Sequence, residues 1–560
     1  MKTILSTLNA KYIHTSLALR WLYVANKERF DIEFMEFTIK EDVAKIASEL
    51  LATQCDILGL SVYIWNVTAT EKLIKILKEQ KPELIIILGG PEVTYEPEHF
   101  LKEWPIDYVI SGEGEFVLGK LLHAIENNKP KTIPSVSIKE NISLIVAKAD
   151  LEQLSKLPSP YQLEQDKANL SNRMVYFETS RGCPYQCQYC LSSREKGVRY
   201  FPEQYIQENL LYLIHSGARQ IKFLDRTFNL NRTHTLSVFD FLMKHYRKGL
   251  SCQFEVYADL LTDDVIEYLN RQLPEDYFRF EIGIQSTYEP TNLAVNRKQD
   301  FRLLAENIQK LMKGGKVAMH LDLIAGLPHE TFTRFMRSFN DVFALRAKEV
   351  QLGFLKMLRG TKLRNDAEKY GYQYSEQAPY EIYCNAAISV EELQRIHHAE
   401  HALEKFWNSG RFKQSMNKIF DTYYAGGYFE FFDALGLYYN KQGYPQRGYQ
   451  LEDLFRFLNN FLQSINIDLS AELRKDYYNN YHIRPQGYWQ EEFEKGERKR
   501  LLYLIGQDKA FLDRHKLTRQ IVEKKTAINT LSSNKYLLTV FEQEENETIR
   551  REITYCPNSN

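Results

Sequence analysis

The strongest constraint on the fold is an alternation between short aliphatic runs of strand length and longer stretches of helical periodicity. Helix-like segments such as 41–53 and 68–80 separate five candidate strands, at residues 3–8, 31–37, 57–62, 84–88 and 108–110. Continuous aliphatic strands separated by helices are typical of a parallel sheet that is covered on both faces. Residues 1–130 are therefore predicted to form a doubly wound, Rossmann-like α/β domain, whose ligands bind at the carboxyl ends of the strands.

A second alternation begins at residue 174. Helical patterns at 204–215, 233–245 and 301–313 fall between strand candidates at 174–179, 220–224, 253–257, 279–284, 318–324 and 350–355. Six such units predict a partial (β/α)6 barrel over residues 171–360, with its working groups at the carboxyl ends of the strands. The intervening residues 131–170 contain Leu157-Pro158-Ser159-Pro160 and are predicted to be a linker.

From residue 361 to 560 the strand–helix rhythm stops. Long helical patterns at 390–408 and 451–464 are separated by turns rich in Gly and Tyr, so a mainly helical third domain is predicted. Aromatic side chains are frequent here, from Tyr423 to Tyr439. They are interpreted as core, the alternative being a stacking surface for a flat molecule. The charged stretch 542–552 predicts a mobile end.

Composition excludes several classes of protein. A chain of 560 residues is too long for one core, and 44% hydrophobic with 26% charged residues is ordinary for globular proteins. The formal net charge of −1 gives no reason to expect a DNA-binding protein. No apolar run approaches the ~20 residues that a membrane helix needs, and no signal peptide is recognisable. A cytoplasmic protein without membrane partners is therefore expected.

The most informative motif is Arg181-Gly182-Cys183-Pro184-Tyr185-Gln186-Cys187-Gln188-Tyr189-Cys190. Only these three of the seven cysteines are close together in the sequence. Cubane clusters that only carry electrons have four cysteine ligands, so three cysteines leave one iron open for catalysis. Zinc is the alternative, but no second CxxC pair follows. The three thiols are therefore predicted to ligate a catalytic 4Fe-4S cluster.

At this motif the chain resembles the radical S-adenosylmethionine (radical SAM) superfamily, with Tyr189 as the aromatic residue before the last cysteine. The resemblance continues through segments 221–228, 280–286 and 322–331. It implies that the open iron binds S-adenosylmethionine and donates an electron, which releases a 5′-deoxyadenosyl radical. The predicted cofactor contacts are Tyr189, Asp225, Glu255, Glu281 and Gln285. The last four are polar groups at or near strand ends, and their alternative roles are solvated strand ends or helix caps.

Three segments follow predicted strands of the N-terminal domain: Gly59-Leu60-Ser61-Val62-Tyr63-Ile64-Trp65-Asn66, Gly89-Gly90-Pro91-Glu92-Val93-Thr94 and Ser111-Gly112-Glu113-Gly114-Glu115. With these segments the domain resembles the cobalamin-binding domain of cobalamin-dependent radical SAM enzymes, of the class B methyltransferase type. Three loops that follow strands carry the likeness, and glycines there are expected to let the backbone approach a large flat ligand. The Asp-x-His-x-x-Gly loop of other cobalamin proteins is missing, and His14 in the first loop is interpreted as a hydrogen-bonding residue. The alternative is a relic domain that no longer binds cobalamin. The resemblance implies cobalamin contacts at Asn9, Ser61, Trp65, Asn66, Gly89, Gly90, Gly112, Glu113 and Gly114.

The leading hypothesis for function is methylation of an unactivated carbon. One S-adenosylmethionine would methylate cobalt(I) and a second would supply the radical, with the cofactors carrying the chemistry. The first alternative is a rearrangement, cyclisation or reduction without methylation, and the second is a cofactor-sensing binding protein. A flavodoxin- or ferredoxin-type electron donor is expected. The substrate, whether small molecule, RNA or peptide, is left open, as is the role of residues 361–560.

Overall fold

The computed structural model describes residues 1–127, 132–490, 492–544 and 547–557. It divides into two compact units, Met1–Leu393 (the first unit) and Gln394–Asn560 (the second unit). Each unit is described by itself. Within the described residues, no helix is both long enough and apolar enough to cross a lipid bilayer.

The first sheet is parallel in the order β2-β1-β3-β4-β5, and the short β6 joins its edge antiparallel to β5. One face packs on α2, α3 and α4, through side chains such as Ile46, Leu73 and Phe100. The other face packs on α1 and α5, through Leu19 and Leu118. The predicted doubly wound sheet is confirmed. Its elements are β1 (Thr3–Asn9), α1 (Leu17–Asn26), β2 (Ile32–Thr38), α2 (Val43–Ala52), β3 (Ile57–Ser61), α3 (Val67–Gln80), β4 (Ile85–Gly89), α4 (Pro97–Glu103), β5 (Tyr108–Ile110), α5 (Glu115–Glu126) and β6 (Val136–Ser137).

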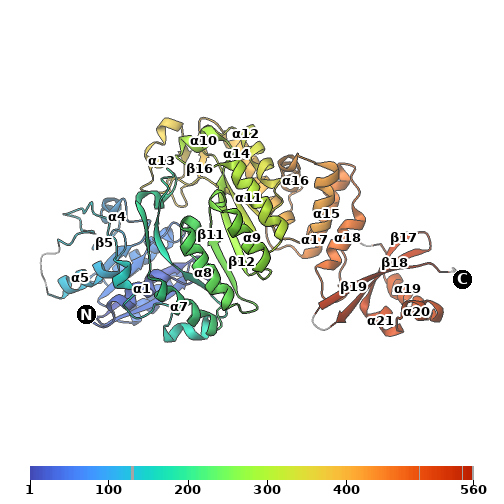
Figure 1. The fold of residues 1–560 in the computed structure, drawn as a ribbon, viewed down its shortest axis with the longest axis horizontal. Helices are drawn as coiled ribbons and strands as arrows, with labels where there is room; N and C mark the ends of the chain where they lie inside the picture. The colour runs from blue at the N-terminus through green and yellow to red at the C-terminus, as the bar shows by residue number, and fades with distance from the viewer. Residues whose placement is uncertain (128–131, 491, 545–546, 558–560) are drawn as a thin grey trace. The chain divides into compact units, whose positions relative to one another are not determined.

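The second sheet has six parallel strands that neighbour one another in chain order, as the predicted partial barrel requires. Figure 1 shows this strand–helix repeat in green, after the blue first sheet. Its strands are β7 (Met174–Phe177), β10 (Gln220–Phe223), β11 (Ser251–Glu255), β12 (Phe278–Gln285), β13 (Ala318–Ala325) and β14 (Glu349–Phe354). Its main helices are α7 (Glu203–His215), α8 (Arg232–Lys244), α9 (Asp263–Gln272), α11 (Phe301–Gly314) and α12 (Phe332–Phe343).

Residues alternate between the two faces of this second sheet, because side chains along a strand have a period of two. Phe254 and Phe280 are fully buried and pack against Phe239 of α8, so they face the helices. The neighbours of these residues along the strands, such as Gln253 and Glu281, therefore face the opposite, concave side. This concave side is polar, in contrast to the aromatic layer under the helices.

The cysteine motif lies in a β-hairpin, which the sequence did not predict. β8 (Ser180–Cys183) pairs antiparallel with β9 (Gly197–Tyr200), and the 3-10 helix η2 (Leu191–Arg194) lies between them. The predicted strand at 174–179 ends earlier, at Phe177. The loop with the three cysteines is therefore supported by its own two strands.

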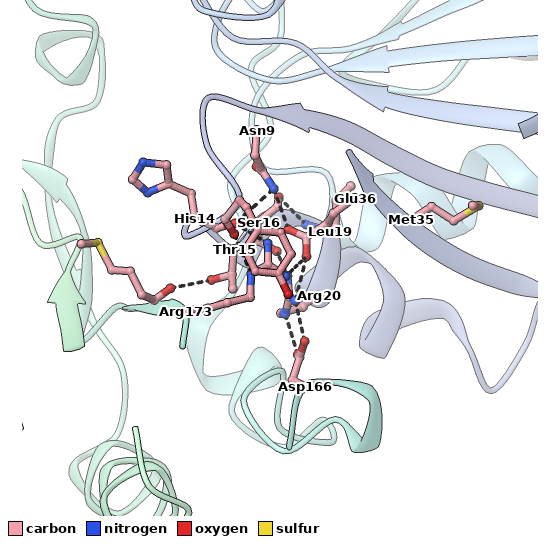
Figure 2. Close-up of polar contacts among 12 residues, drawn as sticks. Asn9, His14, Thr15, Ser16, Leu19, Arg20, Met35, Glu36, Asp166 and Arg173 are labelled. Carbon is pink, nitrogen blue, oxygen red and sulfur yellow. Dashed lines mark hydrogen bonds and ion pairs between the residues drawn. The ribbon is translucent and has the colours of Figure 1, made fainter. Parts of the chain in front are cut away.

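The segment before the barrel is fastened to the first sheet by buried ion pairs (Figure 2). Arg20 of α1 binds Asp166 at 2.6 Å and Glu36 of β2 at 2.9 Å. Arg173 binds the same Glu36 at 3.1 Å. The predicted linker thus has the short elements α6 (Leu151–Leu154) and η1 (Glu164–Asn169) and fixed contacts with the first sheet, whereas residues 128–131 lie outside the described residues.

The second unit is mainly helical, as predicted, but ends in an antiparallel sheet of β17, β18 and β19. Phe429, Phe431 and Phe432 of α16 are fully buried, which confirms the core interpretation for these three. Residues 542–544 and 547–552 lie in β18 and β19, so the prediction of a mobile end is wrong for them. An antiparallel sheet tolerates this charge because one face can be solvated. Residues 545–546 lie outside the described residues.

The elements of this unit begin with α14 (Val390–Leu403) and a π-helix (Glu404–Asn408). They continue with α15 (Lys413–Lys418), a second π-helix (Ile419–Tyr423), α16 (Tyr428–Lys441), α17 (Leu451–Ser464), α18 (Ser470–Asn479), α19 (Glu497–Ile505), α20 (Lys509–His515), α21 (Arg519–Lys525), β17 (Thr526–Ser532), β18 (Lys535–Glu544) and β19 (Glu547–Tyr555).

Candidate functional site

The three motif cysteines come from one tightly turned loop. Cys183 ends β8, Cys190 precedes η2, and Cys187 between them is buried. Gly182 has φ +98°, and a Cβ there would collide with the carbonyl oxygen of Gly197. Only glycine is compatible with both this backbone conformation and the close approach of β8 to β9.

The surroundings of the thiols act in both directions on the loss of their protons. Arg297 Nη1 lies 3.9 Å from Cys187 Sγ, and Thr227 Oγ1 lies 3.8 Å from Cys183 Sγ. Burial raises the pKa of the Cys183 thiol, and negative charge on Cys190 and Cys187 would raise it further. Thiolates at this spacing need nearby positive charge to form. Among the described residues, no three His, Cys, Asp or Glu side chains are grouped as a site for a single metal ion.

Arg297 was not identified from the sequence, yet it connects several parts of the site. It is buried, and it donates hydrogen bonds to the hydroxyls of Tyr257 at 2.9 Å and Tyr189 at 3.2 Å. It also donates to the carbonyl of Gly283 at the end of β12. The predicted cofactor residue Tyr189 is thus held by a cation that also faces Cys187. A single arginine between Asn296 and Lys298 gave no sequence signal.

Asp225 lies at the end of β10, but its carboxylate points into the protein. It accepts hydrogen bonds from the Thr179 backbone N–H at 3.1 Å, from Thr179 Oγ1 at 2.5 Å and from Ser180 Oγ at 2.6 Å. Burial raises the pKa of Asp225 to about 6, against the effect of these hydrogen bonds. These contacts make Asp225 a positioning residue for the start of β8. Its predicted contact with S-adenosylmethionine stays a prediction.

Gln285 has the geometry expected of a cofactor contact. It has φ +69°, a strained conformation for a residue other than glycine, and it lies at a β-bulge between β12 and β13. Its buried Oε1 has no hydrogen-bond partner among the described residues. Bulges and strained residues are concentrated beside active sites. The free acceptor is therefore consistent with a ligand that donates a hydrogen bond.

Glu255 and Glu281 lie on the concave face of the barrel sheet, Glu255 at the end of β11 as predicted and Glu281 in the middle of β12. Their contacts with the cofactor stay predictions. Glu281 forms an ion pair with Lys222 at 2.9 Å and accepts from Gln253. Glu255 has only a weak pair with Arg226 at 3.9 Å. Burial raises the pKa of Glu255, which Arg226 partly offsets. Glu255 thus has fewer close partners than Glu281, and its oxygens are more available to a ligand.

The loop after β3 presents one exposed flat side chain. Trp65 is 47% exposed and stacks on Tyr63 with the ring centroids 4.4 Å apart. Asn66 is fully buried, and its amide binds Thr7 Oγ1 and the carbonyls of Leu8 and Ser61. Trp65 thus fits a large flat ligand such as cobalamin, whereas Asn66 holds the loop together.

Two glycines of the other two loops are required by the packing of the protein itself. Cβ atoms at Gly90 and Gly112, both at positive φ, would collide with the backbones of Val62 and Ala147. The protein's own close approaches therefore require these two glycines. Gly89 has more space around it, and the buried Oγ of Ser111 has no partner among the described residues. Contacts of Gly89, Gly90, Gly112 and Gly114 with cobalamin stay predictions.

The remaining predicted residues of the first sheet are buried near the loop after β1. Asn9 donates to Glu36 at 3.1 Å and to the carbonyl of His14, and Ser61 is also buried. His14 Nδ1 lies 2.8 Å from the hydroxyl of Tyr176 in β7. His14 is thus a hydrogen-bonding residue, as interpreted from the sequence.

Glu113 belongs to an ion network that links the first sheet to the cysteine hairpin. Arg181, two residues before Cys183, lies 3.0 Å from Glu113 and 2.8 Å from both Glu115 and Glu178. Arg199 of β9 also binds Glu113. Burial pushes the pKa of Glu113 up, but Arg199 and Arg181 hold it below its ordinary value. The loop predicted to contact cobalamin is therefore tied to the strand that leads to the cluster cysteines.

Glu330, which follows β13, yields a prediction on pH. It is fully buried and accepts from Ser286 Oγ and Ser338 Oγ at 2.6 Å, and burial raises its pKa to about 7. A carboxyl whose pKa is higher in the folded than in the unfolded state favours folding at pH values below its unfolded pKa. This contribution to stability is lost as the pH rises through the folded pKa of about 7. Glu330→Gln is therefore expected to stabilise the protein by roughly 2–3 kcal/mol at pH 8, since one pKa unit is about 1.4 kcal/mol.

The check is the midpoint of urea unfolding for both proteins at pH 4 and pH 8. At pH 4 the variant should not have a higher unfolding midpoint than the wild type, because the carboxyl of Glu330 is protonated in both the folded and the unfolded state. An equal increase of the unfolding midpoint at both pH values would show that removal of the charge does not cause the stabilisation.

Family comparisons agree with this architecture. Residues 5–122 match the B12 binding domain, residues 177–342 match the radical SAM superfamily, and residues 368–555 match a protein of unknown function, DUF4080. The chain thus contains a B12-binding domain followed by a radical SAM domain. The chain is homologous to the cobalamin-dependent radical SAM methyltransferases, and the cofactor predictions are confirmed at the level of these two domains.

Among similar proteins, the cobalamin-dependent radical SAM methyltransferase TokK of Streptomyces tokunonensis is 28% identical over 51% of this chain and 44% of its own length. An anaerobic magnesium-protoporphyrin IX monomethyl ester cyclase of Synechocystis is 25% identical over 47% of this chain and 53% of its own. The chain thus spans about half the length of these relatives. The structure of the cobalamin-dependent radical enzyme OxsB with aqua-cobalamin has a TM-score of 0.59, 14% identity, and coverage of 86% of this chain and 81% of OxsB, which shows a shared fold.

Proposed function

We propose that the protein is a cobalamin-dependent methyltransferase that acts on an unactivated carbon. The observation that carries this proposal is the Arg181 network, which ties the Glu113 loop of the B12-binding domain to the strand that leads to Cys183. The similarity to TokK, named as a methyltransferase, supports the choice of reaction.

When bound, the cluster supplies the electron that cleaves S-adenosylmethionine and cobalamin supplies methyl-transfer chemistry. Cys183, Cys187 and Cys190 would hold the cluster, and Arg297 keeps positive charge beside the Cys187 thiol. Trp65 would provide a flat face for cobalamin. A one-electron donor of the flavodoxin or ferredoxin type stays a prediction.

A second candidate is a cyclisation or other radical reaction without methylation. The similarity to the magnesium-protoporphyrin ester cyclase favours it, because that relative covers nearly the same share of the chain as TokK. Both candidates require 5′-deoxyadenosine to form, and only methylation also produces S-adenosylhomocysteine.

The test is anaerobic incubation of the reconstituted full-length protein with cobalamin, S-adenosylmethionine and a chemical reductant. We expect both 5′-deoxyadenosine and S-adenosylhomocysteine, the latter in proportion to bound cobalamin. Trp65→Ala should weaken cobalamin binding roughly tenfold through loss of stacking and reduce only S-adenosylhomocysteine. Formation of 5′-deoxyadenosine alone would refute methylation and favour the second candidate.

A further inference from the structure

Lys405 in the second unit is a buried cation whose contacts are with neutral groups. It is 7% exposed, its Nζ lies 2.9 Å from His401 Nε2, and it faces the rings of Tyr439 and Tyr449 at 5.5 and 5.6 Å. Among the described residues, no carboxylate lies within ion-pair distance of its Nζ. A buried charge without a counter-ion is costly, so this arrangement needs an explanation.

The neighbouring ionisable groups do not provide that counter-ion. Glu400 and Glu404 act on Lys405 only at longer range, and Glu404 accepts a hydrogen bond from Asn408. Asp433 of α16 is paired with Arg395. Negative charge is therefore present around the lysine but is not in contact with it.

Two imidazoles add further nitrogen atoms to the same place. His398 and His401 lie three residues apart on α14, and the buried Nδ1 of His398 has no hydrogen-bond partner among the described residues. Burial lowers the pKa of Lys405, and burial together with the charge of Lys405 lowers the pKa of His401 to about 4. The charges of Lys405 and His398 thus disfavour protonation of His401, whereas burial is what lowers the pKa of Lys405.

These groups line a small hollow between α14, α16 and the loop that follows α16. Its wall also includes Gly436, where a Cβ would collide with the backbone of His398, and Gln446. Lys405 itself lies in a π-helix, a rare conformation found frequently at functional sites.

We infer that this hollow binds a small oxyanion, a carboxylate or phosphate group, through Lys405 Nζ and His398 Nδ1. Charge-assisted hydrogen bonds from a lysine are among the strongest in proteins. A bound anion would be the missing counter-ion for Lys405 and the missing partner for His398. This site is independent of the reaction proposed for the first unit.

The experiment adds millimolar inorganic phosphate or sodium acetate to the full-length protein, with sodium chloride at matched ionic strength as the reference. At saturation we expect the thermal midpoint of the second unit to rise by roughly 5 °C or more with at least one of the two anions. Amide exchange should slow in α14 and in the loop 442–450. The anion that acts identifies the class, and no response to either would overturn the inference.

The variant Lys405→Met separates a binding site from a structural lysine. Methionine fills a similar space without charge, so without an anion the variant is expected to melt at the same temperature as the wild type or higher, and to lose the response to the anion. Lys441→Met, at an exposed position of α16, is the control and should respond like the wild type. A variant that keeps the full response would refute the site. If Lys405→Met does not fold, the exchange measurement on the wild type still decides.

Discussion

Alanine in place of Cys183, Cys187 or Cys190 is expected to abolish cluster assembly and to lower 5′-deoxyadenosine formation more than ~100-fold. Losses of that size occur on removal of residues that merely support a metal ligand, and here a ligand itself is lost. The three thiols hold one cluster as a unit, so the triple variant should be no worse than a single one. Iron and sulfide per chain, and the electron paramagnetic resonance signal of the reduced protein, give the measurement.

Cys384→Ala is the matched control for these variants. Cys384 ends the short strand β16 (Ile382–Cys384) and lies outside the cluster motif. It should keep full cluster content and turnover. Cobalamin binding should also survive in Cys183→Ala, because the loops expected to bind cobalamin belong to the other sheet. A motif variant that still cleaves S-adenosylmethionine would show that the ligand assignment is wrong.

Arg181→Met is expected to destabilise the protein by about 3–5 kcal/mol, the range for removal of one partner of a buried ion pair. The side chain of Arg181 is 12% exposed and faces Glu113, Glu115 and Glu178, of which Glu178 also accepts from Trp21 at 2.6 Å. Without the guanidinium these carboxylates remain buried with less compensation. Chemical unfolding measures this decrease in the free energy of unfolding. The iron and sulfide content per chain should also fall, because Cys183 is two residues away from Arg181.

The pH dependence distinguishes this electrostatic cause from a packing defect. The pKa of Glu113 is held below its ordinary value, so its contribution to stability is present at neutral pH and is lost as the pH falls through the folded pKa. The difference in the free energy of unfolding between the wild type and Arg181→Met should therefore become smaller from pH 7 toward pH 4. Arg302→Met, whose side chain is 90% exposed, should change stability by less than about 0.5 kcal/mol. A difference in unfolding free energy between the wild type and Arg181→Met that does not change with pH would contradict the electrostatic explanation.

The two strand–helix domains could be predicted from the sequence because their main strands are parallel and covered by helices. Buried parallel strands appear in the sequence as continuous aliphatic runs, as in residues 84–88, and their helices have a clear period. The hairpin of β8 and β9 could not be predicted this way, because its strands are short and polar. The charged strands β18 and β19 were missed because an exposed face conceals the alternation.

The candidate site was predictable only where spacing alone specifies the chemistry. Three cysteines separated by three and two residues have few other uses, so the spacing alone predicts them as cluster ligands. Asp225 and Asn66 were also found at loops after strands, but their polar atoms are used inside the protein. A position in the sequence locates the end of a strand, but it does not determine which side of the loop a side chain faces.

The sequence alone determined the class of fold and the order of the domains, and it predicted the three thiols as ligands, because periodicity and spacing are local properties of the chain. Only the tertiary structure revealed Arg297 beside Cys187, Arg181 among three glutamates and Lys405 without a counter-ion. Each of these depends on side chains that are far apart in the sequence or on burial, and the energy of a charge is set by the groups that surround it in space.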